Sequence, residues 1–272
     1  MSGARRVLVT GASRGIGRVV ARRLARDGYA VTACARDAQA LGEVVAALPG
    51  GGHRLLALDV ADAAAWAGAA GDLDAVAGVV CAAGILGPIG DLADIDPALF
   101  ARALEVNVAG TMLTLQSCAP ALRAAEGAAV VLSGGGATGP LARFDAYAAS
   151  KAAVVRSPRT PPRAVSASTR SLPGSSSPTC SPRCSTPGLP GAARPTMSGC
   201  AERSTRGPTI LRERRRIAFL LSDDARGISG RLLSATWDRW KDEDFRVWLR
   251  EEPDLATLRC INDQSFTVAA GA

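Results

Sequence analysis

Short apolar segments alternate with helix-like segments through the first 155 residues of this 272-residue chain. Apolar runs predict strands at residues 7–10, 30–35, 55–58, 75–81 and 128–132. Segments with helical spacing of apolar residues follow them, at residues 19–25, 38–48, 61–70, 97–122 and 145–155. Strands that alternate with helices form a parallel sheet covered on both faces, and ligands bind beyond the carboxyl ends of its strands. The pattern therefore predicts an α/β fold with a doubly wound parallel sheet.

A glycine-rich turn, Thr10-Gly11-Ala12-Ser13-Arg14-Gly15-Ile16-Gly17, joins the first predicted strand to the first predicted helix. Its glycines allow a tight turn, a close backbone approach to a pyrophosphate, and close packing of the helix on the sheet. The helix N-terminus adds free N–H groups and the positive end of its dipole. Although the spacing is G-x-x-x-G-x-G rather than G-x-G-x-x-G, the turn predicts a dinucleotide site; the alternative is a glycine turn without a ligand.

Four further motifs follow the turn in order: Asp59-Val60, Cys81-Ala82-Ala83-Gly84, Asn107-Val108-Ala109-Gly110 and Tyr147-Ala148-Ala149-Ser150-Lys151. Together with the turn they resemble the short-chain dehydrogenase/reductase family over residues 5–155. The resemblance implies a Rossmann-like sheet in a single domain, residues 1–272, and a nicotinamide cofactor. The residues expected to bind that cofactor are Gly11, Ser13, Arg14, Gly15, Ile16, Gly17, Arg36, Asp59, Val60, Ala82, Ala83, Gly84, Asn107, Tyr147 and Lys151.

Tyr147 and Lys151 are candidate catalytic residues because four positions separate them, which places them on one helix face. A phenol has a reference pKa of about 10, and a nearby ammonium favours phenolate and lowers that pKa. Tyr147 could then donate a proton to a carbonyl oxygen as hydride arrives, or remove one in reverse. The resemblance implies that Lys151 also holds the nicotinamide ribose and that Asn107 anchors a proton-relaying water. The alternative is an ordinary amphipathic helix.

A serine hydroxyl that binds the substrate oxygen is expected at the end of the fifth predicted strand. The sequence there is Leu132-Ser133-Gly134-Gly135-Gly136, and the family's usual register puts the catalytic serine at Gly134. A one-residue slip of the glycine-rich loop would bring Ser133 into place. We therefore favour Ser133 as the functional serine, with no catalytic serine as the alternative.

The end of the second predicted strand bears on which cofactor is used. NAD enzymes commonly place an acid there for the ribose 2′-OH, whereas an arginine suits a 2′-phosphate. Arg36 stands at this position, and Arg14 in the turn is a second candidate phosphate ligand. We therefore expect NADP rather than NAD; the alternative is that both arginines are solvated surface charges.

Residues 156–209 differ in composition from the rest of the chain. They contain 10 of the 16 prolines, 18 serines and threonines, and eight arginines against one acid, Glu202. This stretch accounts for the whole net charge of +7, so the charge does not indicate a nucleic-acid partner, and stacking aromatic residues are missing from it. Prolines interrupt helices and central strands. We therefore expect an aberrant, disordered segment that breaks the fold after the fifth strand and the Tyr-x-x-x-Lys helix.

A reading-frame shift would explain this segment. With each codon starting at the third base of the one before, Ser168-Thr169-Arg170-Ser171-Leu172-Pro173-Gly174 permits Val-Asn-Ala-Val-Ala-Pro-Gly. That string resembles the family's sixth strand and the loop after it. We expect the original frame to resume upstream of Ile217, because Ile217 to Asp224 resembles the family's late helix and residues 231–234 resemble its last strand.

Two functions are compatible with these features. The first is an oxidoreductase that transfers hydride between NADP(H) and an alcohol or ketone, with activity weakened by the aberrant segment. The second is a non-catalytic, nucleotide-binding homologue. We expect a cytoplasmic protein with a small-molecule substrate, no metal and no membrane or nucleic-acid partner, because the seven cysteines lack paired metal spacing and no long apolar run or signal peptide is evident. The resemblance implies a homodimer or homotetramer.

Sequencing of the coding DNA tests the frame-shift hypothesis. We expect the shifted frame to encode Val-Asn-Ala-Val-Ala-Pro-Gly across 168–174 and Val-Thr-Glu across 157–159. Codons in that frame that encode neither string would show the hypothesis to be wrong.

Overall fold

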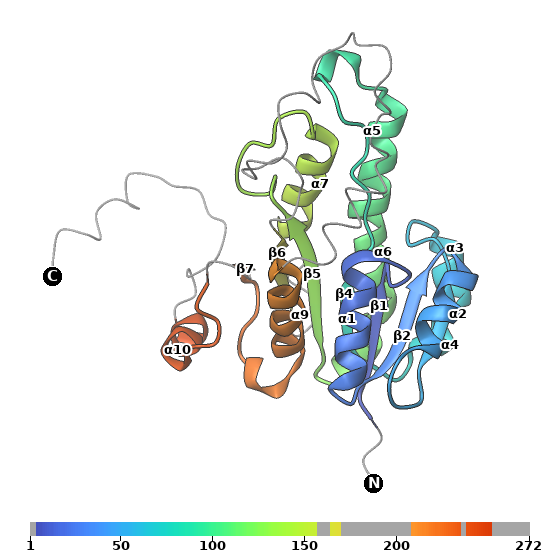
Figure 1. Ribbon diagram of the computed structural model, residues 1–272, viewed down its shortest axis with the longest axis vertical. Helices are drawn as coiled ribbons and strands as arrows, with labels where there is room; N and C mark the ends of the chain where they lie inside the picture. The colour runs from blue at the N-terminus through green and yellow to red at the C-terminus, as the bar shows by residue number, and fades with distance from the viewer. Residues whose placement is uncertain (1–3, 157–163, 170–207, 235–237, 252–272) are drawn as a thin grey trace, which may run out of the picture.

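The computed structural model describes residues 4–156, 164–169, 208–234 and 238–251, and a seven-stranded parallel sheet forms its centre (Figure 1). The strands are β1 (Arg6–Thr10), β2 (Ala30–Ala35), β3 (Arg54–Ala57), β4 (Val76–Cys81), β5 (Ala128–Gly134), β6 (Ala164–Thr169) and β7 (Leu232–Ser234). Their order is β3-β2-β1-β4-β5-β6-β7, so it reverses between β1 and β4. Chain connections diverge at such a reversal and leave a crevice beyond the carboxyl ends of the strands. The predicted doubly wound sheet is confirmed.

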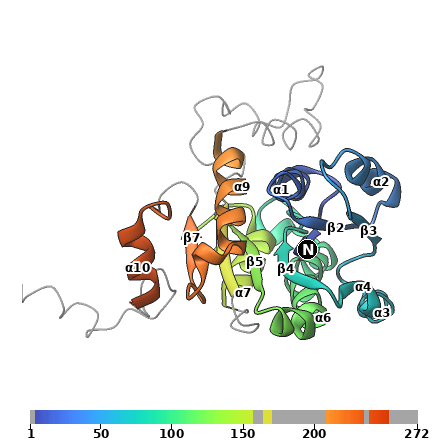
Figure 2. The same cartoon turned by 90° about the horizontal axis from the view of Figure 1, so that it is seen from below.

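Helices cover both faces of this sheet (Figure 2). On one face lie α1 (Gly15–Arg26), α2 (Ala38–Ala46) and α9 (Pro208–Leu221). On the other lie α3 (Ala63–Gly68), α4 (Ala70–Leu73), α6 (Gly110–Ala124) and α7 (Asp145–Arg156), with α5 (Pro97–Leu104) leading into α6. The last described helix, α10 (Glu243–Glu251), lies beyond β7 at the sheet edge.

The core has two apolar layers, one on each face of the sheet. Along β1, Val7 and Val9 join the layer that includes Leu24 and Ile217, whereas Leu8 joins the layer that includes Trp66. All six side chains are buried. Successive strand residues point to opposite faces, so a strand covered on both faces must be apolar throughout. This requirement explains why the strands are continuous apolar runs in the sequence.

The sheet continues past β5, within the stretch that was expected to break it. β6 pairs with β5 from Ala129↔Ala164 to Gly134↔Thr169, and β7 pairs with β6 from Ser166↔Leu232 to Ser168↔Ser234. Residues 164–169 thus supply a strand inside the stretch 156–209. Residues 164–169 contain no proline, so every backbone N–H can join the ladder. The remainder of the aberrant segment, 157–163 and 170–207, lies outside the described residues.

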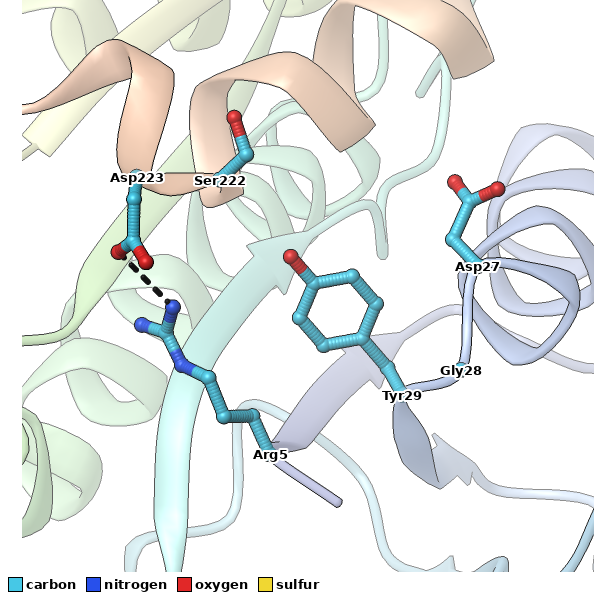
Figure 3. A pocket seen from close by; sticks show the side chains of 6 residues that line it. All are labelled: Arg5, Asp27, Gly28, Tyr29, Ser222 and Asp223. Atoms are coloured by element: carbon cyan, nitrogen blue, oxygen red, sulfur yellow. Dashed lines mark hydrogen bonds and ion pairs between the residues drawn. The ribbon is translucent and has the colours of Figure 1, made fainter. Parts of the chain in front are cut away.

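An ion pair joins the late part of the chain to the first strand. Arg5 Nη1 lies 3.2 Å from Asp223 Oδ1, which follows α9. Figure 3 shows this pair in a pocket of about 320 Å³ whose lining residues are Arg5, Asp27, Gly28, Tyr29, Ser222 and Asp223. Because Arg5 precedes β1 and Tyr29 precedes β2, this pocket lies at the amino ends of the strands, opposite the crevice.

The helical segment Pro97–Ala124 runs from α5 to α6 through a π-type turn at Glu105–Ala109. By length and mean hydropathy (1.2) this segment could cross a membrane, and 39% of its most apolar window is buried inside the structure. Core helices of soluble proteins pass the same test, and here Leu115 and Leu122 are buried in the layer beneath the sheet. The expectation of no membrane partner stays a prediction.

Replacement of Gly17 by alanine should destabilise the fold. A Cβ at Gly17 would lie 2.3 Å from the Gly11 carbonyl oxygen, so α1 would have to move away from the turn. We expect Gly17→Ala to lower the free energy of unfolding by about 1–3 kcal/mol in urea titrations. Gly42, inside α2 with no atom within 4 Å of its added Cβ, is the matched control. Gly42→Ala should raise stability by about 0.5–1 kcal/mol, and equal losses in both variants would contradict the packing argument.

Candidate active site

The glycine-rich turn leaves the carboxyl end of β1 and leads directly into α1. Arg14 occupies the N-cap position of α1 and makes no side-chain capping bond, so the first N–H groups of the helix remain available. Gly15 has φ +57°, and no atom lies within 4 Å of a Cβ added there. A concave backbone with free N–H groups and open space fits a pyrophosphate. Of the other predicted ligands in the turn, Ser13 and Ile16 are half-buried, and Ile16 packs partly against the core.

Thr10 attaches the loop after β4 to this turn. Its hydroxyl oxygen accepts hydrogen bonds from the N–H groups of Ala82 (3.1 Å) and Ala83 (3.2 Å). The loop residues Ala82, Ala83 and Gly84 therefore lie beside the turn, as the sequence predicted for the cofactor site. The sequence interpretation did not assign this role to Thr10, although a threonine at the end of a strand and before a glycine could have suggested it.

Asn107 is fully buried in the π-type turn and connects two parts of the site. Its Oδ1 accepts from the Ile85 N–H, and its Nδ2 donates to the Ile85 carbonyl and to Ser150 Oγ, all at 2.8 Å. Ser150 Oγ donates in turn to the Tyr147 carbonyl at 2.7 Å. The amide of Asn107 thus holds the β4 loop against α7. Sequence reasoning missed Ser150, which lies one residue before the lysine of the motif.

Lys151 is buried between β5 and the loop after β4. Its Nζ donates to the Leu132 carbonyl at 2.8 Å and lies 5.5 Å from the centroid of the Tyr147 ring. A Cβ added to Gly84 would lie 3.6 Å from this Nζ and 3.1 Å from Asn107 Oδ1. The structure therefore brings Tyr147, Lys151, Asn107 and the Ala82–Gly84 loop together, at the carboxyl ends of the strands.

Burial controls the protonation of this pair. It raises the pKa of Tyr147 to about 12 and lowers the pKa of Lys151 to about 8, a fall that the Cys81 thiol partly opposes. In each case burial penalises the charged form. The predicted lowering of the phenol pKa by the ammonium is therefore not seen in this structure, where burial raises that pKa. The Lys151 Nζ lies over the ring and donates to a carbonyl, and the hydroxyl is itself desolvated.

The position next to the Tyr147 hydroxyl is occupied by Gly134. A Cβ added to Gly134 would lie 2.5 Å from the Tyr147 Oη. Ser133 is buried, and its hydroxyl donates to the Lys151 carbonyl at 3.3 Å. β5 pairs with β6 through Ser133↔Ser168 and Gly134↔Thr169, and position 134 rather than 133 is the one that faces the phenol. The structure therefore does not bring the Ser133 hydroxyl to the phenol.

A cluster of charged side chains lies at the carboxyl ends of β2 and β3. Asp59 Oδ1 accepts from the Ala61 N–H at 3.0 Å, and Oδ2 accepts from Arg102 Nη2 at 2.7 Å. Arg36 Nη1 lies 3.9 Å from the same Oδ2, and two-thirds of the Arg36 side chain is exposed. Burial would raise the pKa of Asp59, but the Ala61 N–H and the Arg102 guanidinium lower it below its usual value. Next in the chain, Val60 is buried against Gly110.

Comparisons with known proteins show which family this chain resembles. Residues 5–160 match the short chain dehydrogenase family. Human dehydrogenase/reductase SDR family member 2, mitochondrial, is 32% identical over 164 residues, covering 56% of this chain and 57% of that protein. D-threitol dehydrogenase of Mycolicibacterium smegmatis is 36% identical over 157 residues, covering 54% of this chain and 59% of that protein. The matched region thus spans somewhat more than half the length of these relatives.

Solved structures are similar over a longer part of the chain. A short chain dehydrogenase/reductase family protein superposes with a TM-score of 0.67 at 26% identity, covering 86% of this chain and 97% of that one. The alcohol dehydrogenase from the archaeon Thermococcus sibiricus, complexed with 5-hydroxy-NADP, gives a TM-score of 0.56 at 28% identity. The match covers 61% of this chain and 77% of that one. This chain belongs to the short-chain dehydrogenase/reductase family, whose fold implies a nicotinamide dinucleotide cofactor.

Proposed function

We propose that this chain is an NADP-dependent oxidoreductase that interconverts a small-molecule alcohol and the corresponding ketone. The observation that carries the proposal is the meeting of Tyr147, Lys151 and the Gly84 loop beside the open glycine turn. A proton donor thus lies near the backbone cradle suited to a dinucleotide. Such proximity is what transfer of a hydride and a proton to one carbonyl group requires.

The residues of the site favour carbonyl reduction over alcohol oxidation. The bound cofactor supplies the hydride chemistry at its nicotinamide ring. Tyr147, with its pKa raised to about 12, holds its proton at neutral pH and can donate it to a carbonyl oxygen. The same phenol is a poor base for the reverse reaction. Lys151 carries its positive charge below pH of about 8, where the ammonium can bind the hydroxyls of a nicotinamide ribose.

A non-catalytic, nucleotide-binding homologue is the second candidate function. Gly134 offers no hydroxyl beside the phenol, and the phenol itself is a weak acid because it is desolvated. One lost donor to a developing oxyanion commonly reduces kcat by about 10²–10³-fold. We therefore expect weak or no turnover even where the cofactor binds.

Binding and turnover measured on the same sample separate the two functions. NADPH is titrated by fluorescence, and its oxidation is then followed over a panel of carbonyl compounds. Turnover that Tyr147→Phe abolishes, while NADPH affinity stays within about twofold, supports the enzyme. Binding without turnover supports the second candidate, and brisk turnover would contradict the expectation of weak activity. If the protein neither binds NADPH nor turns over any carbonyl compound, both proposals are wrong.

The preference for NADP rests on the charged group at the end of β2. Arg36 is largely exposed and Arg14 is exposed in the turn, so both guanidinium groups are accessible to an added phosphate. Guanidinium binds phosphate through paired hydrogen bonds. The Thermococcus sibiricus relative, solved with an NADP derivative, is consistent with this choice.

The remaining expectations concern assembly and location. We propose a homodimer or homotetramer on the strength of the family resemblance, and a cytoplasmic location on the pattern of cysteines. We propose that the substrates are small-molecule alcohols and carbonyl compounds.

Titration of the phenol tests how burial and Lys151 affect Tyr147. The chain has two tyrosines, so Tyr147 is the sole tyrosine in a Tyr29→Phe background. We expect phenolate absorbance near 295 nm to rise with a midpoint near pH 12, or to appear only as near-ultraviolet circular dichroism is lost by alkaline unfolding. The added substitution Lys151→Met should not raise that midpoint. A folded protein with a midpoint below pH of about 9 would show that the ammonium does lower the pKa of the phenol.

Removal of the Arg36 charge tests cofactor preference. We expect Arg36→Gln to weaken NADPH binding about tenfold while NADH binding changes less than about twofold, since only NADPH carries the 2′-phosphate. Arg22→Gln, on the exposed face of α1, removes the same charge away from the site and should leave both affinities unchanged. An unchanged ratio of the two affinities in Arg36→Gln would contradict the NADP proposal.

A further inference from the structure

Arg102 reaches the cofactor end of the sheet from α5, 43 residues away from Asp59 in the sequence. Its Nη2 donates to Asp59 Oδ2 and its Nη1 donates to Glu105 Oε2, both at 2.7 Å. Arg36 approaches the same Asp59 oxygen only to 3.9 Å. Asp59 is therefore held mainly by Arg102 and by the Ala61 N–H, and the Arg36 guanidinium remains largely in solvent.

We propose that Arg102 is a positioning residue for cofactor selection, which engages the Asp59 carboxylate and so leaves Arg36 available for a 2′-phosphate. This inference rests on the proposed NADP dependence. Asp59 is the carboxylate beside Arg36, and it would compete with the phosphate for that guanidinium if Arg102 did not hold it. A carboxylate that is not neutralised would also repel the incoming phosphate, which is itself an anion.

The balance of charge supports this role. Arg36 and Arg102 face Asp59 and Glu105, so the four side chains carry no net charge together. Without the Arg102 guanidinium the group has a net charge of −1, at the place where a doubly charged phosphate is expected. The 2′-OH of NADH is uncharged there, so its binding should respond far less to the same change.

If Arg102 served only to stabilise the packing of α5 against the loop after β3, it would make the same contacts. Cofactor discrimination separates this structural role from a role in cofactor selection. Loss of a purely structural contact would change the affinities for both dinucleotides alike, because they share the adenine, the ribose and the pyrophosphate. A positioning residue for selection changes the ratio of the NADPH and NADH affinities. That ratio is measured by binding alone, without a substrate or turnover.

The test is a set of dissociation constants for NADPH and NADH, measured by fluorescence at fixed ionic strength on the full chain. We expect Arg102→Gln to weaken NADPH binding about tenfold and NADH binding less than about twofold. Glu105→Gln keeps the bond from Arg102 to Asp59 and removes a negative charge, so it should not weaken NADPH binding relative to NADH binding. Arg102→Lys, which keeps the charge but not the fork, should lie between wild type and Arg102→Gln.

The double variant Arg102→Gln/Asp59→Asn gives the decisive result. When the carboxylate is removed, Arg102 has nothing to neutralise, so the NADPH-to-NADH ratio should return to within about threefold of Asp59→Asn alone. Equal losses of both affinities in Arg102→Gln, no loss of either, or no recovery in the double variant would each overturn the inference. If Arg36→Gln shifts the ratio but Arg102→Gln does not, the proposed role of Arg102 is wrong and the NADP proposal stands. If Arg36→Gln also leaves the ratio unchanged, the NADP proposal fails as well.

Discussion

The Thr10 hydroxyl accepts two backbone N–H groups, those of Ala82 and Ala83, at the point where the strand order reverses. These bonds fix the loop after β4 against the turn after β1, and Asn107 then fixes the same loop to α7 through Ile85 and Ser150. The position of Tyr147 relative to the dinucleotide cradle thus depends on a series of hydrogen bonds that begins at β1. A buried N–H left without its acceptor costs about 1–3 kcal/mol, so this series holds the loop in one arrangement.

Burial gives this site a definite chemical bias. The phenol and the ammonium are both withdrawn from water, and each resists taking its charged form. Gly134 contributes because its missing side chain lets the Tyr147 hydroxyl rest against β5. The phenol is therefore kept as a neutral hydroxyl, which holds a proton that it can donate but is a weak acid. A hydroxyl at position 134 would need the Tyr147 Oη to move, so the small residue and the position of the phenol belong together.

Local pattern was enough to predict most of the fold, because each buried strand must be apolar and each motif lies within a few residues. The second strand was predicted at its observed bounds, Ala30–Ala35, and the turn, the Ala82–Gly84 loop, Asn107, Tyr147 and Lys151 do meet. Properties set by the environment could not be predicted in this way. The pKa of Tyr147 depends on burial, and the positions of Ser133 and Gly134 depend on strand register. The contact of Arg102 with Asp59 spans 43 residues and has no local signal.

The sixth strand shows how a stretch of unusual composition can still complete the sheet. Parallel pairing joins backbone N–H and carbonyl groups, which every residue except proline supplies in full. Residues 164–169, Ala-Val-Ser-Ala-Ser-Thr, contain no proline, and their backbone completes the ladder between β5 and β7. A reading-frame shift would therefore change the side chains without removing the pairing. Recognition of a substrate depends instead on the identity of those side chains, so the effect of such a shift would fall on the pocket more than on the sheet.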